Sequence, residues 1–130
     1  MTYVLDLRAW MWAQLAPERL SPRAAALIDD PAQVPCLSAI TLHQVLCLAA
    51  DGRLRLEVPA EAWIRTSLAR RPMSILPVTA EIALAAGQLT GFTPADLLDR
   101  FVVATALVHR VPLVTCDAAI SRSGLVAVVW

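Results

Sequence analysis

Two aspartates directly follow apolar segments that are typical of buried strands. Asp6 comes after residues 3–5, and Asp117 comes two residues after the apolar segment 112–115. Parallel strands end at the same edge of a sheet, and ligands of such sheets bind beyond the carboxyl ends of the strands. We therefore expect both carboxylates at one rim, where they could take part in chemistry.

Asp96 and Asp99 stand three residues apart near the start of the longest expected helix, residues 93–110, so their side chains share one face. With Asp6 and Asp117, three chain regions would deliver carboxylates to one rim. Clustered carboxylates repel unless a cation lies among them, and oxygen ligands favour Mg²⁺ or Mn²⁺. The alternative for each aspartate is a helix cap or a solvated loop position, and for Asp96 a cap is the simplest interpretation.

Composition excludes several classes of function. Eleven basic and eleven acidic residues give a net charge of zero, which disfavours a strongly basic nucleic-acid binder but not a local basic patch. Every basic residue is arginine, so mechanisms that need a lysine are excluded. Three widely spaced cysteines and the absence of a signal-peptide pattern favour the cytoplasm, and the longest apolar run, residues 101–108, is too short to span a membrane.

Short apolar segments alternate with helical ones along all 130 residues. Helix caps and prolines at Ser21-Pro22 and Thr93-Pro94, and the turn at Asp51-Gly52, mark the boundaries. This order predicts a single α/β domain with a mainly parallel sheet covered on both faces. The expected strands are residues 3–5, 34–37, 73–78, 112–115 and 126–130; helices are expected over 9–15, 22–28, 38–50, from 59, from 79, over 93–110, and briefly after 117.

Two tryptophans on the first helix suggest a partner surface. Trp10 and Trp12 flank Met11, and positions two apart on a helix cannot both face one core. We expect one ring in the core and the other in a partner groove.

Six motifs, in order, resemble PIN-domain proteins, most closely the VapC-like toxins of type II toxin–antitoxin systems, over essentially the whole chain. They are Val4-Leu5-Asp6 with Ala9-Trp10-Met11-Trp12; Pro17-Glu18-Arg19-Leu20-Ser21-Pro22; Leu37-Ser38-Ala39-Ile40-Thr41-Leu42; Gly52-Arg53-Leu54-Arg55-Leu56 with Leu76-Pro77-Val78-Thr79; Asp99-Arg100-Phe101-Val102-Val103-Ala104-Thr105-Ala106; and Pro112-Leu113-Val114-Thr115-Cys116-Asp117.

The resemblance implies a three-layer α/β/α sandwich that hydrolyses RNA phosphodiesters with Mg²⁺ or Mn²⁺. Asp6, Asp99 and Asp117 match the family's metal-binding acids, with Asp96 a possible auxiliary. The partners implied are RNA, a second copy of the chain, and a cognate antitoxin whose tail inserts into an apolar groove beside the acids.

The sequence departs from the family pattern at two places. Where members carry a second acid, this chain has Gln44, which keeps the shape of glutamate but not its charge, and no acid lies one helical turn away. After Asp6, members have a small hydroxyl residue, whereas this chain has Leu7 and Arg8. Gln44 would complete the catalytic set, Arg8 and Arg100 would contact RNA, and Arg8 could alternatively act as an internal counter-ion.

Two functions follow from these residues. The first is a metal-dependent ribonuclease toxin in which Gln44 replaces one acid. The alternative is a catalytically decayed PIN domain that acts as an RNA-binding or protein-interaction module.

Overall fold

Five short parallel strands form one sheet in the order β3-β2-β1-β4-β5. The structure is a computed structural model that describes residues 2–93 and 97–130. The strands are β1 (Thr2–Leu5), β2 (Val34–Ser38), β3 (Ser74–Leu76), β4 (Leu113–Val114) and β5 (Val128–Val129). All five predicted strands are therefore present, the last three shorter than expected, and every pairing is parallel.

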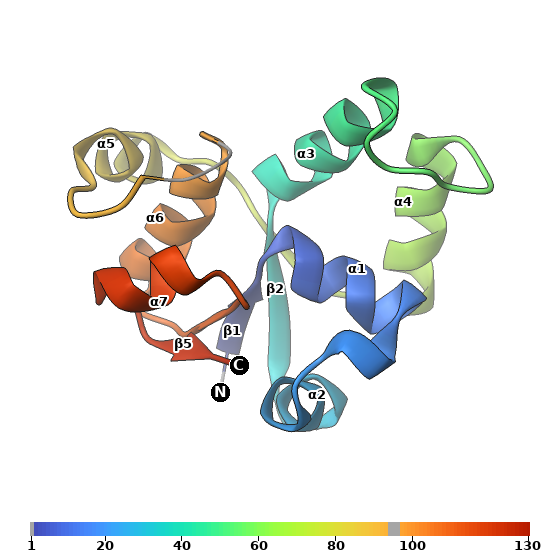
Figure 1. The fold of residues 1–130 in the computed structure, drawn as a ribbon, viewed down its shortest axis with the longest axis horizontal. Helices are drawn as coiled ribbons and strands as arrows, with labels where there is room; N and C mark the ends of the chain where they lie inside the picture. The colour runs from blue at the N-terminus through green and yellow to red at the C-terminus, as the bar shows by residue number, and fades with distance from the viewer. Residues whose placement is uncertain (1, 94–96) are drawn as a thin grey trace.

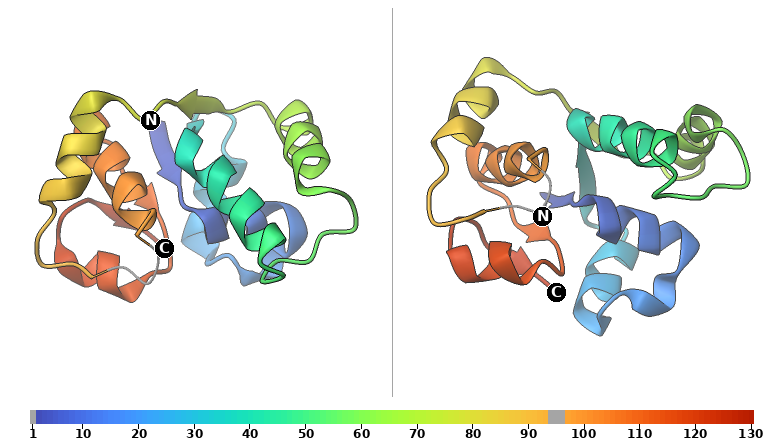
Figure 2. Two further views of the ribbon diagram at one scale, coloured as in Figure 1. Left: turned by 90° about the horizontal axis from the view of Figure 1, so that it is seen from above. Right: turned by 45° about the horizontal axis from the view of Figure 1, so that its top comes forward.

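Helices cover both faces of this sheet. In Figure 1, α1 to α4 lie on one side of β1 and β2, and α5 to α7 lie on the other. The turned views of Figure 2 show the same two groups. The predicted three-layer sandwich is thus confirmed. The helices are α1 (Leu7–Leu15), α2 (Pro22–Asp29), α3 (Ala39–Ala50), α4 (Ala60–Arg70), α5 (Ala80–Gln88), α6 (Asp99–His109) and α7 (Ala118–Ser123), with a 3₁₀ turn at Pro17–Arg19.

The central strand β1 divides the core into two halves because its side chains alternate between faces. Tyr3 and Leu5 pack with Trp10 in one buried cluster, whereas Val4 packs with Val103 in the other. All five side chains are almost fully buried. A continuous apolar strand is what a sheet covered on both faces requires.

The order of the strands creates a crevice between β1 and β4. The chain runs outward from β1 through β2 to β3, then crosses to the other side of β1 for β4 and β5. The backbone N–H of Asp6 donates to the carbonyl of Val114 (3.1 Å), which ties the ends of β1 and β4 together. The carboxyl ends of strands at such a reversal are the usual place for a ligand site in α/β folds.

The predicted helix over residues 93–110 is wrong at its start. α6 begins at Asp99, after a turn in which the N–H groups of Arg100 and Phe101 donate to the carbonyls of Leu97 and Leu98 (3.2 and 3.0 Å). These bonds span three residues, the tighter 3₁₀ pattern, so regular α-helix starts only afterwards. With 11 residues, α6 is also shorter than α3, with 12. The cap expected at Asp96 lies outside the described residues.

No helix within residues 2–93 and 97–130 is long and apolar enough to cross a bilayer.

Candidate functional site: an acidic cavity at the ends of β1 and β4

Asp6 is the N-cap of α1, and two hydrogen-bond donors hold its carboxylate. Its Oδ1 accepts the backbone N–H of Ala9 (2.8 Å), the usual bond of a helix N-cap. Its Oδ2 accepts the hydroxyl of Thr115, which lies just beyond β4, at 2.5 Å. The carboxylate is therefore fixed between the first turn of α1 and the neighbouring strand.

Asp117 is fixed in a similar way at the start of α7. Its Oδ1 accepts the backbone N–H groups of Ala119 (2.8 Å) and Ile120 (3.1 Å). Its own N–H donates to the Thr115 hydroxyl oxygen (3.1 Å). Its Oδ2 lies 4.0 Å from a guanidinium nitrogen of Arg8, a half-exposed side chain. The helix-cap alternative is thus confirmed for both aspartates, and it leaves their carboxylates at the sheet edge.

The third carboxylate is held by the glutamine that departs from the family pattern. Gln44 lies on α3 with only 1% of its surface exposed. Its side-chain Nε2 donates to Oδ1 of Asp99 at the start of α6 (3.0 Å), across 55 residues of sequence. The acidic neighbour of Gln44 therefore comes from another helix rather than from its own.

These side chains line one open cavity of about 350 Å³. The expectation that three separate chain regions bring aspartates to one rim is confirmed, while Asp96 lies outside the described residues. Two arginines complete the polar lining, and four apolar side chains form the rest of the wall. The lining comprises Asp6, Asp99, Asp117, Gln44, Arg8 and Arg53 with Leu7, Leu48, Val102 and Ile120.

Burial dominates the electrostatics of Asp6. Desolvation raises the pKa of this carboxyl above its ordinary value of 3.8, and the negative charge of Asp117 raises it further. The hydrogen bonds from Thr115 and Ala9 and the positive charge of Arg8 oppose this rise because they favour the ionised form. The charged state of Asp6 is consequently costly in free energy for the folded protein.

The carboxylates suit a hydrated Mg²⁺ or Mn²⁺ better than a closed metal cage. Among the residues that the structure describes, no three acidic, histidine or cysteine side chains are close enough together to enclose an ion. Mg²⁺ commonly keeps several waters and needs only one or two protein carboxylates together with substrate phosphates. Asp6, Asp99 and Asp117 lie around one cavity and offer oxygen ligands only, so they fit an ion held in that way.

Sequence reasoning missed Thr115 as a site residue. Its hydroxyl donates to Asp6 and accepts from the N–H of Asp117, so one side chain links the two acids. The available signal was its position, a buried hydroxyl at the end of an apolar strand two residues before an aspartate. Arg53 also lines the cavity. Its position in the sequence gives no indication of this, because it follows the turn at Asp51-Gly52 rather than an apolar strand.

Arg100 has backbone partners at the end of α5. Its guanidinium donates to the carbonyls of Ala86 (2.9 Å) and Leu89 (2.8 Å). These carbonyls belong to the last turn of α5, where a cation also complements the helix dipole. The contacts give Arg100 a structural role between α5 and α6, and its contact with RNA stays a prediction.

The two tryptophans of α1 separate as expected, one into the core. Trp10 is 3% exposed and packs edge-on against Trp63, with ring centres 5.2 Å apart. Trp10 is therefore the ring that lies in the core rather than in a partner groove, because it packs among residues of α1, α4 and the sheet. Trp12 is the more exposed ring and lies against Trp130, with centres 5.8 Å apart. A partner contact for Trp12 stays a prediction.

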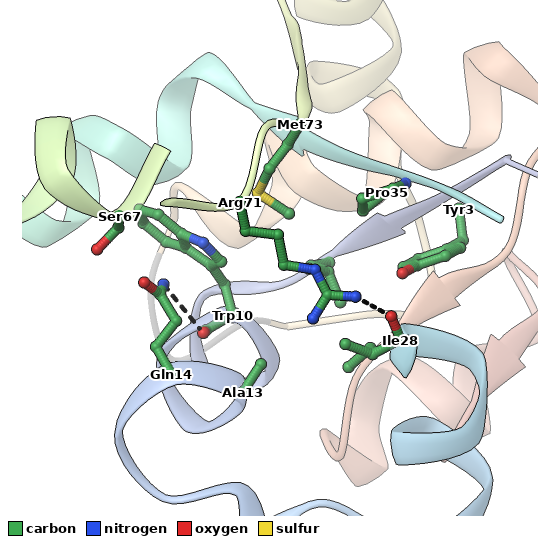
Figure 3. Close-up of a pocket in the computed structure, with 10 residues that line it drawn as sticks. Tyr3, Trp10, Ala13, Gln14, Ile28, Pro35, Ser67, Arg71 and Met73 are labelled. Carbon is green, nitrogen blue, oxygen red and sulfur yellow. Dashed lines mark hydrogen bonds between the residues drawn. The ribbon is translucent and has the colours of Figure 1, made fainter. Parts of the chain in front are cut away.

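A second, smaller cavity lies beneath α1 on the other side of Trp10. Figure 3 shows it between Tyr3, Trp10 and Met73, with Arg71 reaching across to donate to the carbonyl of Ile28. The Tyr3 hydroxyl is fully buried and has no hydrogen-bond partner within the described part of the chain. The cavity measures about 40 Å³, which is room for water molecules rather than for a substrate.

An open groove of about 510 Å³ adjoins this small cavity and shares Gln14 and Ser67 with it. It lies between the end of α1, the segment 55–58 and α4. Its lining combines apolar side chains with two arginines, Arg55 and Arg70, and one acid, Glu57. The acidic residues of the first cavity do not line it, so the groove and the acidic cavity are separate surfaces.

The protein is a five-stranded parallel α/β/α domain with acidic side chains where the strand order reverses. Comparison with known proteins identifies the family that has this fold. The PIN domain family model matches residues 3–124. The chain is 31% identical to Ribonuclease VapC22 of Mycobacterium tuberculosis over 116 residues, which covers 89% of this chain and 87% of the relative. The chain therefore belongs to the PIN-domain family, among its VapC-like toxins.

Solved structures share the fold. VapBC2 from Rickettsia felis has a TM-score of 0.72 at 15% identity and covers 98% of this chain and 97% of its own. VapBC-1 from nontypeable Haemophilus influenzae has a TM-score of 0.68 at 20% identity, with coverage of 98% and 96%. FitAcB from Neisseria gonorrhoeae has a TM-score of 0.66 at 23% identity, with coverage of 97% and 95%.

Proposed function

We propose that this protein is a Mg²⁺-dependent ribonuclease toxin of a toxin–antitoxin system that acts in the cytoplasm. The observation that carries the proposal is the meeting of Asp6, Asp99 and Asp117 in one cavity. A relative that shares 31% identity over most of both chains is a ribonuclease by name, which supports the same activity.

Asp6, Asp99 and Asp117 would hold the metal ion, with Asp96 a further candidate outside the described residues. The bound ion supplies an activated water and neutralises negative charge on the phosphate during hydrolysis. The protein contributes the rigid placement of the carboxylates: Thr115 and the start of α1 fix Asp6, and the start of α7 fixes Asp117. Rigid placement matters because small displacements of catalytic groups lower the reaction rate.

Gln44 would act as a neutral positioning residue rather than as a fourth acid. Its amide already donates to Asp99, so it orients that carboxylate without adding charge. A neutral hydrogen bond contributes about 1 kcal/mol net, whereas a carboxylate near a cation contributes several-fold more at short range. We therefore expect weaker metal binding than with glutamate at this position.

The arginines at the rim would meet the substrate. Arg8 is half exposed, and Arg53 also lines the cavity. Guanidinium groups bind phosphate oxygens through paired hydrogen bonds, which suits an RNA backbone entering the cavity. Because the net charge of the chain is zero, the attraction for RNA phosphates has to come from local arginines such as these.

The antitoxin would occupy the groove between α1 and α4. The similar solved structures include a toxin–antitoxin complex and a member of the VapBC family of toxin–antitoxin systems, which supports an antitoxin partner. The lining combines apolar Trp63 and Leu56 with two arginines and one acid, Glu57, which suits an amphipathic segment. A homodimer would in addition cover exposed apolar side chains such as Leu84 on α5.

One observation favours the alternative of a catalytically decayed domain. Asp6 accepts from Thr115 and Ala9, Asp99 accepts from Gln44, and Asp117 lies beside Arg8, so all three carboxylates have partners within the protein. Such internal partners offset the repulsion that otherwise calls for a metal ion. In that case the protein would bind RNA or a protein partner without cleaving anything.

Incubation of the purified full chain with a structured RNA distinguishes the two functions. Reactions with Mg²⁺ or Mn²⁺ and with a chelator run beside an Asp6→Asn variant as control. Cleavage that requires the metal and is lost in the variant supports the ribonuclease. Equal cleavage by parent and variant indicates a contaminant, and no cleavage by either supports the decayed domain.

A further inference from the structure

Two tryptophans and two arginines gather next to the acidic cavity. The rings of Trp12 on α1 and Trp130 at the end of the chain have centres 5.8 Å apart and are tilted by 54°. The guanidinium carbons of Arg8 and Arg19 lie 6.0 and 5.5 Å from the centre of the Trp12 ring. We refer to these four side chains as the Trp12 platform.

The platform is accessible, and its two arginines are held only by weak contacts. Arg8 has 53% of its side chain exposed, Arg19 is exposed, and both tryptophans are only partly buried. A cation–π contact at an exposed site contributes about 0.5–1 kcal/mol, so an anion can draw a guanidinium away at low cost. Within residues 2–93 and 97–130, no carboxylate lies within ion-pair distance of Arg19.

Arg8 connects the platform to the acidic cavity. The same guanidinium that lies near the Trp12 ring lines the cavity and stands 4.0 Å from Asp117. One guanidinium is therefore near both the Trp12 ring and a carboxylate of the cavity. A nucleic-acid strand with one phosphate at the cavity would place its neighbouring nucleotide beside Trp12.

We propose that the Trp12 platform binds unpaired nucleotides that flank the phosphate in the acidic cavity. This inference rests on the proposed function, because it assumes that RNA is the ligand of that cavity. Aromatic rings with arginines beside them are the chemistry by which proteins bind single strands: bases stack on the rings, and the cations meet the phosphates. A duplex hides the faces of its bases, so the platform selects single-stranded RNA.

An acidic peptide is the other ligand that aromatic and basic side chains could bind. The shared use of Arg8 favours RNA, because the carboxylates on its other side would repel an acidic peptide unless a cation lay between them. In the proposed function a metal ion binds together with the substrate phosphate, and this cation offsets the repulsion for RNA.

The test is the affinity of the full chain for a short, fluorescently labelled oligouridylate, measured by fluorescence anisotropy in an Asp6→Asn background that prevents cleavage. We expect Trp12→Leu to raise Kd about tenfold, in line with the contribution of one stacked base. We expect Arg19→Gln to lower the slope of log Kd against log salt by about 0.7, the value for one phosphate contact on a single strand. Arg65→Gln, which alters an exposed arginine paired with Glu61 on α4, is the matched control and should change neither quantity.

Unchanged affinity and salt slope in Trp12→Leu and Arg19→Gln would overturn the platform, whether or not the parent protein cleaves RNA. Equal affinity for a duplex of the same length would overturn it as well. If Trp12→Leu and Arg19→Gln weaken RNA binding but the protein with Asp6 intact does not cleave RNA, the platform would be supported and the ribonuclease rejected. Trp12→Phe, which keeps an aromatic face, should restore most of the affinity and thereby separates stacking from a loss of folding in Trp12→Leu.

Discussion

The side-chain amide of Gln44 donates to the carboxylate of Asp99 at 3.0 Å, although the two residues are 55 positions apart. This contact joins α3 to α6 at the wall of the acidic cavity. A glutamate at the same place would put a buried carboxylate beside the partly buried carboxylate of Asp99. The contact therefore bears on the stability of the fold and on how strongly the cavity binds a cation.

Gln44→Glu should lower stability in the absence of metal and restore it in the presence of metal. Two carboxylates in contact repel by about 4 kcal/mol at an effective dielectric constant near 20, part of which is relieved when one takes up a proton. We expect a loss of about 2–3 kcal/mol in the free energy of unfolding with chelator at neutral pH. Urea unfolding with chelator and with Mn²⁺ measures both effects.

Gln14→Glu provides the matched control, because Gln14 is exposed on α1. The same chemical change there should alter the free energy of unfolding by less than about 0.5 kcal/mol. Equal stability of Gln44→Glu and Gln14→Glu in chelator would contradict the contact between Gln44 and Asp99.

Thr115→Val should loosen two aspartates at once. The valine has the same shape but neither donates to Asp6 nor accepts from the N–H of Asp117. Loss of hydrogen bonds to a buried charge costs about 1–3 kcal/mol, and the pKa of Asp6 should rise further. Chemical denaturation and NMR titration of Asp6 check the two expectations. Thr105→Val is the control, since that hydroxyl donates only to the Phe101 carbonyl of its own helix and should cost less.

The raised pKa of Asp6 predicts how stability depends on pH. Because the folded protein holds the proton of Asp6 more tightly than the unfolded chain does, this group favours folding at acidic pH. That contribution is lost as the pH rises through the folded pKa, above the ordinary value of 3.8. Asp6→Asn, which removes the charge and keeps a helix cap, should therefore unfold at a higher temperature than the parent at neutral pH. A gain that did not shrink on acidification would argue against this explanation.

Arg8→Gln should strengthen metal binding while it weakens RNA binding. Removal of a cation 4.0 Å from Asp117 relieves its competition with a metal ion. An exposed pair of this kind is worth about 0.2–1 kcal/mol, which corresponds to a change of up to about fivefold in Kd for Mn²⁺. Titration calorimetry with Mn²⁺ measures the gain. If Arg8→Gln bound Mn²⁺ more weakly than the parent, Arg8 would not be acting as an internal counter-ion.

The strand pattern was predictable because the strands lie in short, mainly apolar runs that alternate with helical segments. The meeting of Asp6 and Asp117 followed from parallel topology alone. The start of α6 was not predictable, since Thr93-Pro94 imitates a helix start and the tighter turn at Leu97 depends on tertiary packing.

The hydrogen-bond partners of the polar side chains also could not be predicted from the sequence. Nothing near Gln44 in sequence points to Asp99, because that contact exists only once α3 and α6 pack on the sheet. Arg100 stands beside a candidate acid in the sequence, yet its guanidinium contacts the end of α5, since adjacent helix positions point in different directions. The linking role of Thr115 likewise requires β1 and β4 to be neighbours.

The central claim is that Asp6, Asp99 and Asp117 together form a divalent-metal site. Titration of the parent with Mn²⁺, followed by the electron paramagnetic resonance of the free ion, tests it without depending on RNA or activity. We predict saturable binding of Mn²⁺ that is weakened at least about tenfold by Asp117→Asn and strengthened by Gln44→Glu. Binding that is absent from the parent, or that is the same in the parent and Asp117→Asn, would contradict the account.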